Sequence, residues 1–125
     1  VIVENGGDIF LKTRKGRQIG IYAGNSKPWN RLALKIKAKD TPLGICTSSG
    51  TIGHSLSFGR ADSAVIISKN TALADAVATA TANRVNSKED LREALDFARG
   101  IKGICGVIII FKNNLVSWGK VQFIK

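Results

Sequence analysis

The sequence predicts an α+β fold in which two consecutive helices pack on one side of a mostly antiparallel sheet. Two observations support this prediction. Short segments in which apolar and polar residues alternate, the pattern of half-buried strands, occur towards both ends of the chain. Between them, residues 71–100 combine regularly spaced alanines with an apolar stripe at helical spacing.

The part of the chain before residue 70 is expected to form strands at residues 1–4, 9–13, 17–23, 32–39, 43–47 and 63–68. Residues 9–13 and 17–23 are separated by the polar segment Arg14-Lys15-Gly16, which predicts that they form a hairpin. In residues 32–39 apolar residues alternate with lysines, which predicts a strand with one buried face. Residues 63–68 are apolar at their centre, which predicts a fully buried strand.

Residues 71–84 are ambiguous by pattern, because alanines at alternate positions imitate a strand. Alanine is the best helix former and a poor strand former, so we expect a helix whose small side chains permit close packing on a sheet. A second helix is expected over residues 87–100. Ser87 stands at its N-cap, Asp90 at the capping-box position and Gly100 at its C-terminal end. The last strands are expected at residues 106–111, 115–118 and 121–124.

Length and composition limit the class of protein. The 125 residues (13.4 kDa) suffice for one domain with a hydrophobic core, and 44% hydrophobic and 22% charged residues are typical of a globular chain. The longest apolar run, residues 106–111, is far shorter than the ~20 residues that cross a bilayer, so no membrane partner is expected. The chain begins with Val1 and contains no methionine, so we expect a processed protein or a piece of a longer one.

The two cysteines, Cys46 and Cys105, have neither the spacing of metal ligands nor that of a disulfide framework. Both lie in apolar segments, where a thiol behaves as a small apolar side chain. We therefore expect both to be buried and reduced, in a cytoplasmic protein.

Positive charge dominates the chain, with 19 lysines and arginines against nine acidic residues and a formal net charge of +10. Nine of the basic residues fall within residues 1–39, beside two acidic ones. Such a patch can bind nucleic acid or phosphate. The alternation of Lys35, Lys37 and Lys39 with apolar residues also fits the solvated face of a strand, and few aromatic residues accompany the patch. Nucleic acid is therefore the less favoured partner.

Three polar segments are candidates for a functional site. The first is Glu4-Asn5-Gly6-Gly7-Asp8, where the N–H groups of a glycine turn beside a carboxylate can approach a phosphate; an ordinary hairpin turn is the alternative. The second is the hydroxyl-rich segment Thr47-Ser48-Ser49-Gly50-Thr51-Ile52-Gly53-His54-Ser55, which suits an anion. His54, the one histidine of the chain, is either a base or a structural hydrogen-bonding residue.

The third candidate is Asp75 with Thr79, which share one face of the predicted helix because they are four residues apart. A carboxylate and a hydroxyl are hard-oxygen ligands of the kind that Mg²⁺ takes. The alternative is a helix-surface pair that binds nothing. We expect Asp75 to be buried in the alanine-rich helix and to need a partner, for which Arg60 is a candidate.

Three segments, taken together in this order, resemble the C-terminal half of the ApbE family: Asn5-Gly6-Gly7-Asp8, Thr47-Ser48-Ser49-Gly50 and Ala74-Asp75-Ala76-Val77-Ala78-Thr79-Ala80. Members of that family are Mg²⁺-dependent FAD:protein FMN transferases, once called thiamine biosynthesis lipoproteins. Residues 3–9, 53–62 and 73–83 look typical of a mainly prokaryotic family of uncharacterised ApbE-like proteins. Because the resemblance covers essentially the whole chain, residues 1–125 are expected to be the C-terminal portion of a single ApbE-like domain whose N-terminal portion is missing.

The resemblance also implies roles for individual residues. Asp75 and Thr79 match the side chains that hold Mg²⁺ in the transferases. His54 matches a histidine that precedes an Asp-Pro pair in the transferases, where this chain has Ser57 and Phe58, and it is the candidate catalytic residue. The residues expected at the flavin nucleotide are those of the glycine turn and of the loop that lines the same cleft: Asn5, Gly6, Gly7, Asp8, Thr47, Ser48, Ser49, Gly50 and Thr51.

The function that follows from the resemblance is Mg²⁺-dependent binding of a nucleotide, with FAD as the candidate. Cleavage or transfer of a phosphoryl or FMN group, in a transferase-like or pyrophosphatase-like reaction, is the expected chemistry. One alternative is a non-catalytic binding protein that kept the fold, which the changes at Ser57 and Phe58 favour. A basic nucleic-acid-binding domain is a less favoured alternative. The expected partners are the nucleotide, the missing N-terminal part of the protein and further copies of the same chain.

Overall fold

The computed structural model describes residues 2–5, 8–21, 27–29, 32–48 and 61–124. Its elements are, in chain order, β1 (Ile2–Asn5), β2 (Asp8–Leu11), β3 (Arg17–Gly20), β4 (Ala33–Ile36), β5 (Leu43–Ser48), β6 (Ser63–Ser68), α1 (Thr71–Ala82), α2 (Leu91–Arg99), β7 (Ile104–Phe111), β8 (Asn114–Gly119) and β9 (Phe123–Ile124). Short 3₁₀ turns occur at Lys27–Trp29, Ala38–Asp40 and Lys88–Asp90.

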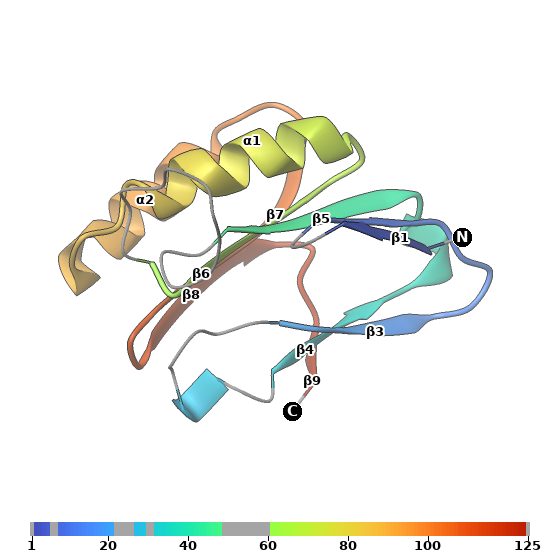
Figure 1. Cartoon of the computed structure of the whole chain (residues 1–125), viewed down its shortest axis with the longest axis horizontal. Helices are drawn as coiled ribbons and strands as arrows, with labels where there is room; N and C mark the ends of the chain where they lie inside the picture. The colour runs from blue at the N-terminus through green and yellow to red at the C-terminus, as the bar shows by residue number, and fades with distance from the viewer. Residues whose placement is uncertain (1, 6–7, 22–26, 30–31, 49–60, 125) are drawn as a thin grey trace.

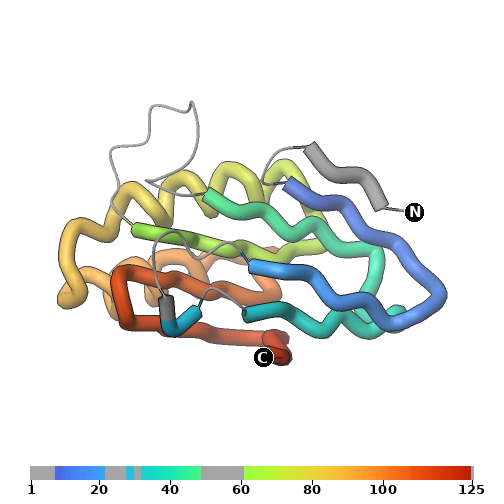
Figure 2. The backbone as a smooth tube through the Cα atoms, turned by 60° about the horizontal axis from the view of Figure 1, so that its bottom comes forward, coloured from blue at the N-terminus to red at the C-terminus, as the bar shows by residue number. Residues whose placement is uncertain are grey.

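These elements form three layers (Figure 1). The middle layer is a six-stranded antiparallel sheet in the order β1-β2-β5-β6-β7-β8. Helices α1 and α2 cover one face of it, and a three-stranded antiparallel sheet, β3-β4-β9, lies against the other face (Figure 1, Figure 2). The predicted α+β class, with two helices on one side of an antiparallel sheet, is confirmed, and the strands divide between two sheets.

Two hydrophobic clusters separate the layers, because neighbouring residues of a strand point to opposite faces of a sheet. On β7, Val107 and Ile109 belong to the cluster beneath the helices, whereas Ile108 and Ile110 belong to the cluster between the two sheets. All residues of β6 are buried, as the sequence predicted for residues 63–68. The central strands are therefore covered on both faces, which explains their continuous apolar sequences.

The hairpin predicted for residues 9–13 and 17–23 is wrong. β2 lies between β1 and β5 in the large sheet, and β3 pairs with β4 in the small one. The physical reason is burial: Leu11 of β2 packs in the cluster between the sheets, and the chain crosses to the second layer, where Ile19 and Ile21 cover the same cluster. A polar tip between two apolar segments does not distinguish a hairpin from such a crossing.

Both predicted helices form. The alanines Ala74, Ala78 and Ala82 give α1 a buried face of small side chains. Ahead of α2, Oδ2 of Asp90 accepts a hydrogen bond of 3.1 Å from the backbone N–H of Ser87, as a capping box requires. In the part of the chain that the structure describes, neither helix is long and apolar enough to cross a membrane.

Two expectations for the strands and cysteines need correction. The strand predicted over residues 32–39 ends at Ile36, because a 3₁₀ turn follows in which Oγ1 of Thr41 donates to the Ala38 carbonyl oxygen (2.7 Å). Cys46 is buried as expected, but Cys105 is only half-buried. Cys105 lies near the start of β7, at the rim of a groove between the two sheets.

Glycine sets the distance between α1 and the large sheet. A Cβ atom built at Gly44 of β5 would lie 2.7 Å from the Cα atom of Thr71 in the first turn of α1. No side chain fits between two main chains at that separation, so glycine permits the close approach. The helix consequently lies almost directly on β5, over the residues that follow Gly44 in this strand.

Replacing Gly44 with alanine is expected to destabilise the fold by about 1–3 kcal/mol, because the added methyl group overpacks the contact with Thr71. Gly20 of β3 is the matched control, since a Cβ there would meet no atom within 4 Å. Gly20→Ala should therefore be neutral or stabilising by up to about 1 kcal/mol. Urea unfolding measures both variants, and equal effects would contradict the close packing of α1 on β5.

Candidate functional site

The carboxylate of Asp8 lies at the start of β2, on the sheet face that α1 covers. Asp8 pairs with Asn5 of β1 on one side and with Cys46 of β5 on the other. Cys46 belongs to the hydrophobic cluster beneath the helices. Directly paired residues of an antiparallel ladder share a face, so Asp8 points towards α1.

Asp75 of α1 brings a second carboxylate to this place. Burial raises the pKa of Asp8 above its ordinary value of 3.8, a hydrogen bond with Cys46 opposes that rise, and the negative charge of Asp75 adds to it. Two carboxylates from distant parts of the sequence therefore act on one another. The prediction that Asp75 is buried is wrong: α1 packs on the sheet through its alanines and turns Asp75 towards solvent.

Cys46 is a part of this site that the sequence analysis did not single out. Its thiol is fully buried, and Sγ lies 3.4 Å from the backbone carbonyl oxygen of Thr71, which competes with the carboxylate of Asp8 for the one thiol proton. Burial, together with the negative charges of Asp8 and Asp75, raises the pKa of Cys46 to about 12. A thiol with this pKa is protonated at neutral pH, which disfavours Cys46 as a nucleophile. The pairing of β2 with β5 is the signal that would have found it.

Thr79 follows Asp75 by one turn of α1, as the spacing predicted. Its hydroxyl donates a hydrogen bond of 3.3 Å to the backbone carbonyl oxygen of Asp75. The hydroxyl oxygen keeps its lone pairs in this arrangement and can still accept or coordinate. Asp75 and Thr79 thus place a carboxylate and a hydroxyl one turn apart on α1, and the carboxylate is within electrostatic reach of Asp8.

Of the predicted 47–51 loop, the structure describes Thr47 and Ser48, and it places them on opposite faces of the large sheet. Thr47 pairs with Val65, whose side chain is in the cluster between the sheets, whereas Ser48 pairs with Ala64 in the cluster beneath the helices. Successive strand residues alternate, so Ser48 lies on the face of Asp8 and Thr47 lies on the opposite face. Of the two hydroxyls, only that of Ser48 is on the side of the carboxylates.

Several predicted site residues lie outside the described residues. They are Gly6, Gly7, Ser49, Gly50, Thr51 and His54, together with Arg60, the candidate partner of Asp75. Their assignment to a nucleotide site, and that of His54 to catalysis, stay predictions. For Asn5 the structure gives the pairing with Asp8 on the β1–β2 hairpin.

Among the described residues, the side chains at this place offer carboxylate and hydroxyl oxygens, which are the ligands of hard cations. Within the described ranges there is no group of three or more His, Cys, Asp or Glu side chains that could enclose a metal ion. Two carboxylates and a hydroxyl nevertheless offer the oxygen ligands that Mg²⁺ takes when a bound phosphate completes its coordination. The mutual repulsion of Asp8 and Asp75 is the electrostatic condition that a cation would relieve.

Comparison with known proteins defines the class of this protein. A family model described as AbpE bacteria matches residues 1–115, so the chain belongs to this ApbE-like family. It is 46% identical over 123 residues to a UPF0280 protein of Methanobrevibacter smithii, and this match covers 95% of the chain and 52% of the relative. A UPF0280 protein of Methanocella arvoryzae is 44% identical over 119 residues, with 95% of the chain and 48% of the relative covered.

A third relative, the UPF0280 protein of Methanocaldococcus jannaschii, is 40% identical over 126 residues, which cover 97% of the chain and 52% of the relative. The chain thus spans about half the length of the curated relatives it matches. The names of these relatives state no substrate or reaction. They support the expected ApbE-like family of uncharacterised proteins, and which half of the relatives the chain represents stays a prediction.

The raised pKa of Asp8 predicts a pH-dependent effect of Asp8→Asn. Ionised Asp8 is less favourable in the folded protein than in the unfolded chain, so the substitution should stabilise the fold at neutral pH. The advantage should shrink as the pH falls through the raised pKa and disappear below 3.8, where Asp8 is protonated in both states. Urea unfolding between pH 8 and pH 4 gives the measurement.

Glu93→Gln on α2 is the control for this prediction, because Glu93 is an exposed carboxylate away from the site. Its effect should be small and should not follow the same pH profile. A loss of stability on Asp8→Asn at neutral pH would contradict the prediction. It would show that hydrogen-bonding partners stabilise the ionised carboxylate of Asp8 in the folded protein.

Proposed function

We propose that this protein binds a nucleotide together with Mg²⁺, with FAD as the leading candidate, at a site that includes Asp8, Asp75 and Thr79. The observation that supports this most directly is the electrostatic interaction between Asp8 of β2 and Asp75 of α1, two carboxylates that come from different layers of the fold. No ion pair joins either carboxylate to a basic side chain among the described residues, and two neighbouring carboxylates without such a partner are disfavoured unless a cation joins them.

The oxygen donors of this site fit Mg²⁺. The ion binds through one or two protein carboxylates and takes further oxygens from water and from substrate phosphates. Asp8 and Asp75 would supply the carboxylates, and Oγ1 of Thr79, which already bonds to the Asp75 carbonyl oxygen, would supply a hydroxyl. When bound, the cation would neutralise charge on a pyrophosphate as a P–O bond breaks.

The remaining parts of the proposed site come from the glycine turn and the loop after β5. The nucleotide would be approached by Asn5, Gly6, Gly7 and the 47–51 loop. Within that loop, Ser48 is the described residue whose hydroxyl lies on the same face of the sheet as Asp8. His54 would act as the acid or base of a cleavage or transfer step. Residues of the whole protein would complete this site, because the chain spans about half the length of its relatives. We assign it to their C-terminal portion and expect identical chains to associate.

A second candidate is a binding protein that has kept this site without the transfer chemistry. The sequence His54-Ser55-Leu56-Ser57-Phe58 favours it, because Ser57 and Phe58 replace the Asp-Pro pair of the transferases. Both candidates require Mg²⁺-dependent nucleotide binding, and only the first gives FMN and AMP from FAD. Analysis of products after incubation of the whole protein with FAD and Mg²⁺ distinguishes them.

Asp75→Asn is expected to weaken Mg²⁺-dependent binding of FAD by about 10-fold or more, because it removes one charged ligand and keeps the shape of the side chain. Calorimetry of the whole protein with FAD, with and without Mg²⁺, measures this effect. Glu93→Gln is the matched control, since it removes one exposed carboxylate elsewhere, and it should leave FAD binding unchanged. Binding that ignores Mg²⁺, or equal losses in both variants, would refute the proposal.

A further inference from the structure

A groove of about 470 Å³ opens between the two sheets, on the face of the large sheet opposite to Asp8 and Asp75. Its floor is apolar, built from the side chains of Ile36, Leu43, Ile67 and Val121, which belong to the cluster between the sheets. Its volume lies within the range of about 300–1,000 Å³ that small-molecule sites occupy. The groove is therefore large enough for a small ligand, and its floor is apolar.

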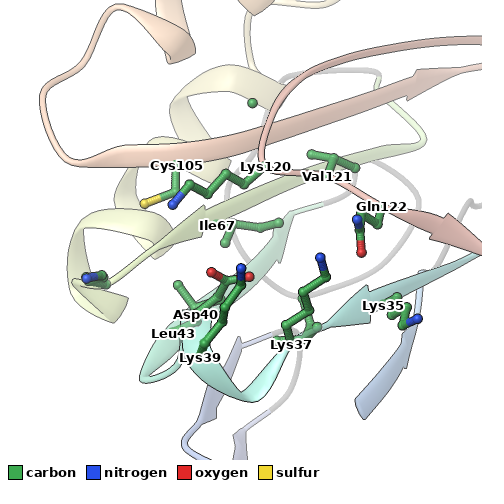
Figure 3. A pocket seen from close by; sticks show the side chains of 13 residues that line it. Lys35, Lys37, Lys39, Asp40, Leu43, Ile67, Cys105, Lys120, Val121 and Gln122 are labelled. Atoms are coloured by element: carbon green, nitrogen blue, oxygen red, sulfur yellow. The ribbon is translucent and has the colours of Figure 1, made fainter. Parts of the chain in front are cut away.

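Lysines surround this groove. They come from the end of β4, the 3₁₀ turn after it, the end of β6 and the segment before β9: Lys35, Lys37, Lys39, Lys69 and Lys120. Asp40 is the one acidic residue among the described residues that line the groove. In Figure 3, the amino group of Lys37 points towards the middle of the groove and Lys120 extends towards Cys105, whereas Lys35 points away at the rim.

These positive charges are not neutralised by ion pairs in the part of the chain that the structure describes. The salt bridges found there join Asp96 of α2 to Arg92 and Arg99, and α2 lies on the opposite face of the large sheet from the groove. Charges of one sign that converge on a cleft with low-dielectric walls focus the electrostatic potential inside it. The groove is consequently a favourable place for an anion.

Hydrogen bonds hold the walls of the groove in place. On one side, Oγ1 of Thr41 donates to the Ala38 carbonyl oxygen (2.7 Å), which holds the turn that carries Lys39. On the other side, the N–H of Lys120 donates to the Cys105 carbonyl oxygen (2.9 Å). Sites whose walls are ordered before binding lose less conformational entropy when a ligand arrives.

We propose that this groove binds a small organic or inorganic anion that carries two or more phosphate groups. Five lysines against one aspartate match a ligand of several negative charges, and the apolar floor accommodates an uncharged part of it. None of the described residues that line the groove is aromatic, so among them there is no stacking surface of the kind that holds single-stranded nucleic acids. The site is independent of the proposed Mg²⁺ site, because it lies on the other face of the sheet and uses different residues.

Calorimetric titration of the whole protein with tripolyphosphate, without Mg²⁺, tests the proposal. The double variant Lys37→Gln with Lys120→Gln should weaken binding by about 10-fold or more, since Lys37 points towards the middle of the groove and Lys120 lies at its rim beside Cys105. The control is Lys88→Gln with Lys102→Gln, which removes two exposed lysines at other places and should change binding less than about 2-fold. Circular dichroism confirms that both double variants fold.

Cys105 provides a second measurement, because its half-buried thiol lines the groove whereas the thiol of Cys46 is fully buried. Tripolyphosphate should slow the reaction of Cys105 with N-ethylmaleimide, a neutral reagent. Equal losses of affinity in the two double variants, or full reactivity of Cys105 at saturating tripolyphosphate, would overturn the proposal. An oligonucleotide that binds more tightly than tripolyphosphate and depends on the same two lysines would also overturn it.

Discussion

The burial of the large sheet on both faces is the constraint on which the other features of this molecule depend. Strands β6 and β7 contribute alternate residues to two clusters, one beneath the helices and one beneath the small sheet. Each strand therefore carries apolar residues to both sides and leaves little room there for polar groups. Polar side chains are therefore found near the edges of the layers that cover the sheet. The carboxylates of Asp8 and Asp75 lie at one such edge, and the lysine-lined groove lies at another on the opposite face.

The covering layers differ in how closely they approach the sheet, and this difference shapes the two sites. On one face, Gly44 and the buried alanines bring α1 almost onto β5, so that Asp75 comes within electrostatic reach of Asp8 and Cys46. On the other face, larger side chains such as Ile36 and Ile67 separate the two sheets and leave a groove between them. On the helix-covered face, close packing thus brings two carboxylates near each other. On the face covered by the small sheet, looser packing leaves a groove that is open to solvent.

Much of the secondary structure could be predicted from the sequence, because it depends on local pattern. The alanine-rich segment formed a helix, and Ser87 with Asp90 marked the start of the next one. The grouping of strands into sheets could not be predicted, since residues 9–13 and 17–23 look like a hairpin until the burial of Leu11 is known. Such burial depends on contacts between residues that are distant along the chain.

For the candidate site, too, local spacing could be predicted from the sequence, whereas contacts between distant residues could not. The spacing of Asp75 and Thr79 was enough to place them one turn apart on a helix, but the exposure of Asp75 required knowledge of which face packs on the sheet. The nearness of Asp8, Cys46 and Asp75 depends on the β2–β5 pairing. The lysine groove was visible in the sequence only as a basic N-terminal third, because Lys69 and Lys120 join it from later in the chain.

The alanine face of α1 also limits how this sequence can change. Ala74, Ala78 and Ala82 have essentially no exposed surface, and the helix that carries them rests on a glycine. A larger side chain at any of these positions would lift the whole helix, and Asp75 would move away from Asp8 with it. Variation in α1 is therefore expected to accumulate on its outer face, while the inner face stays restricted to the smallest residues even where no ligand touches it.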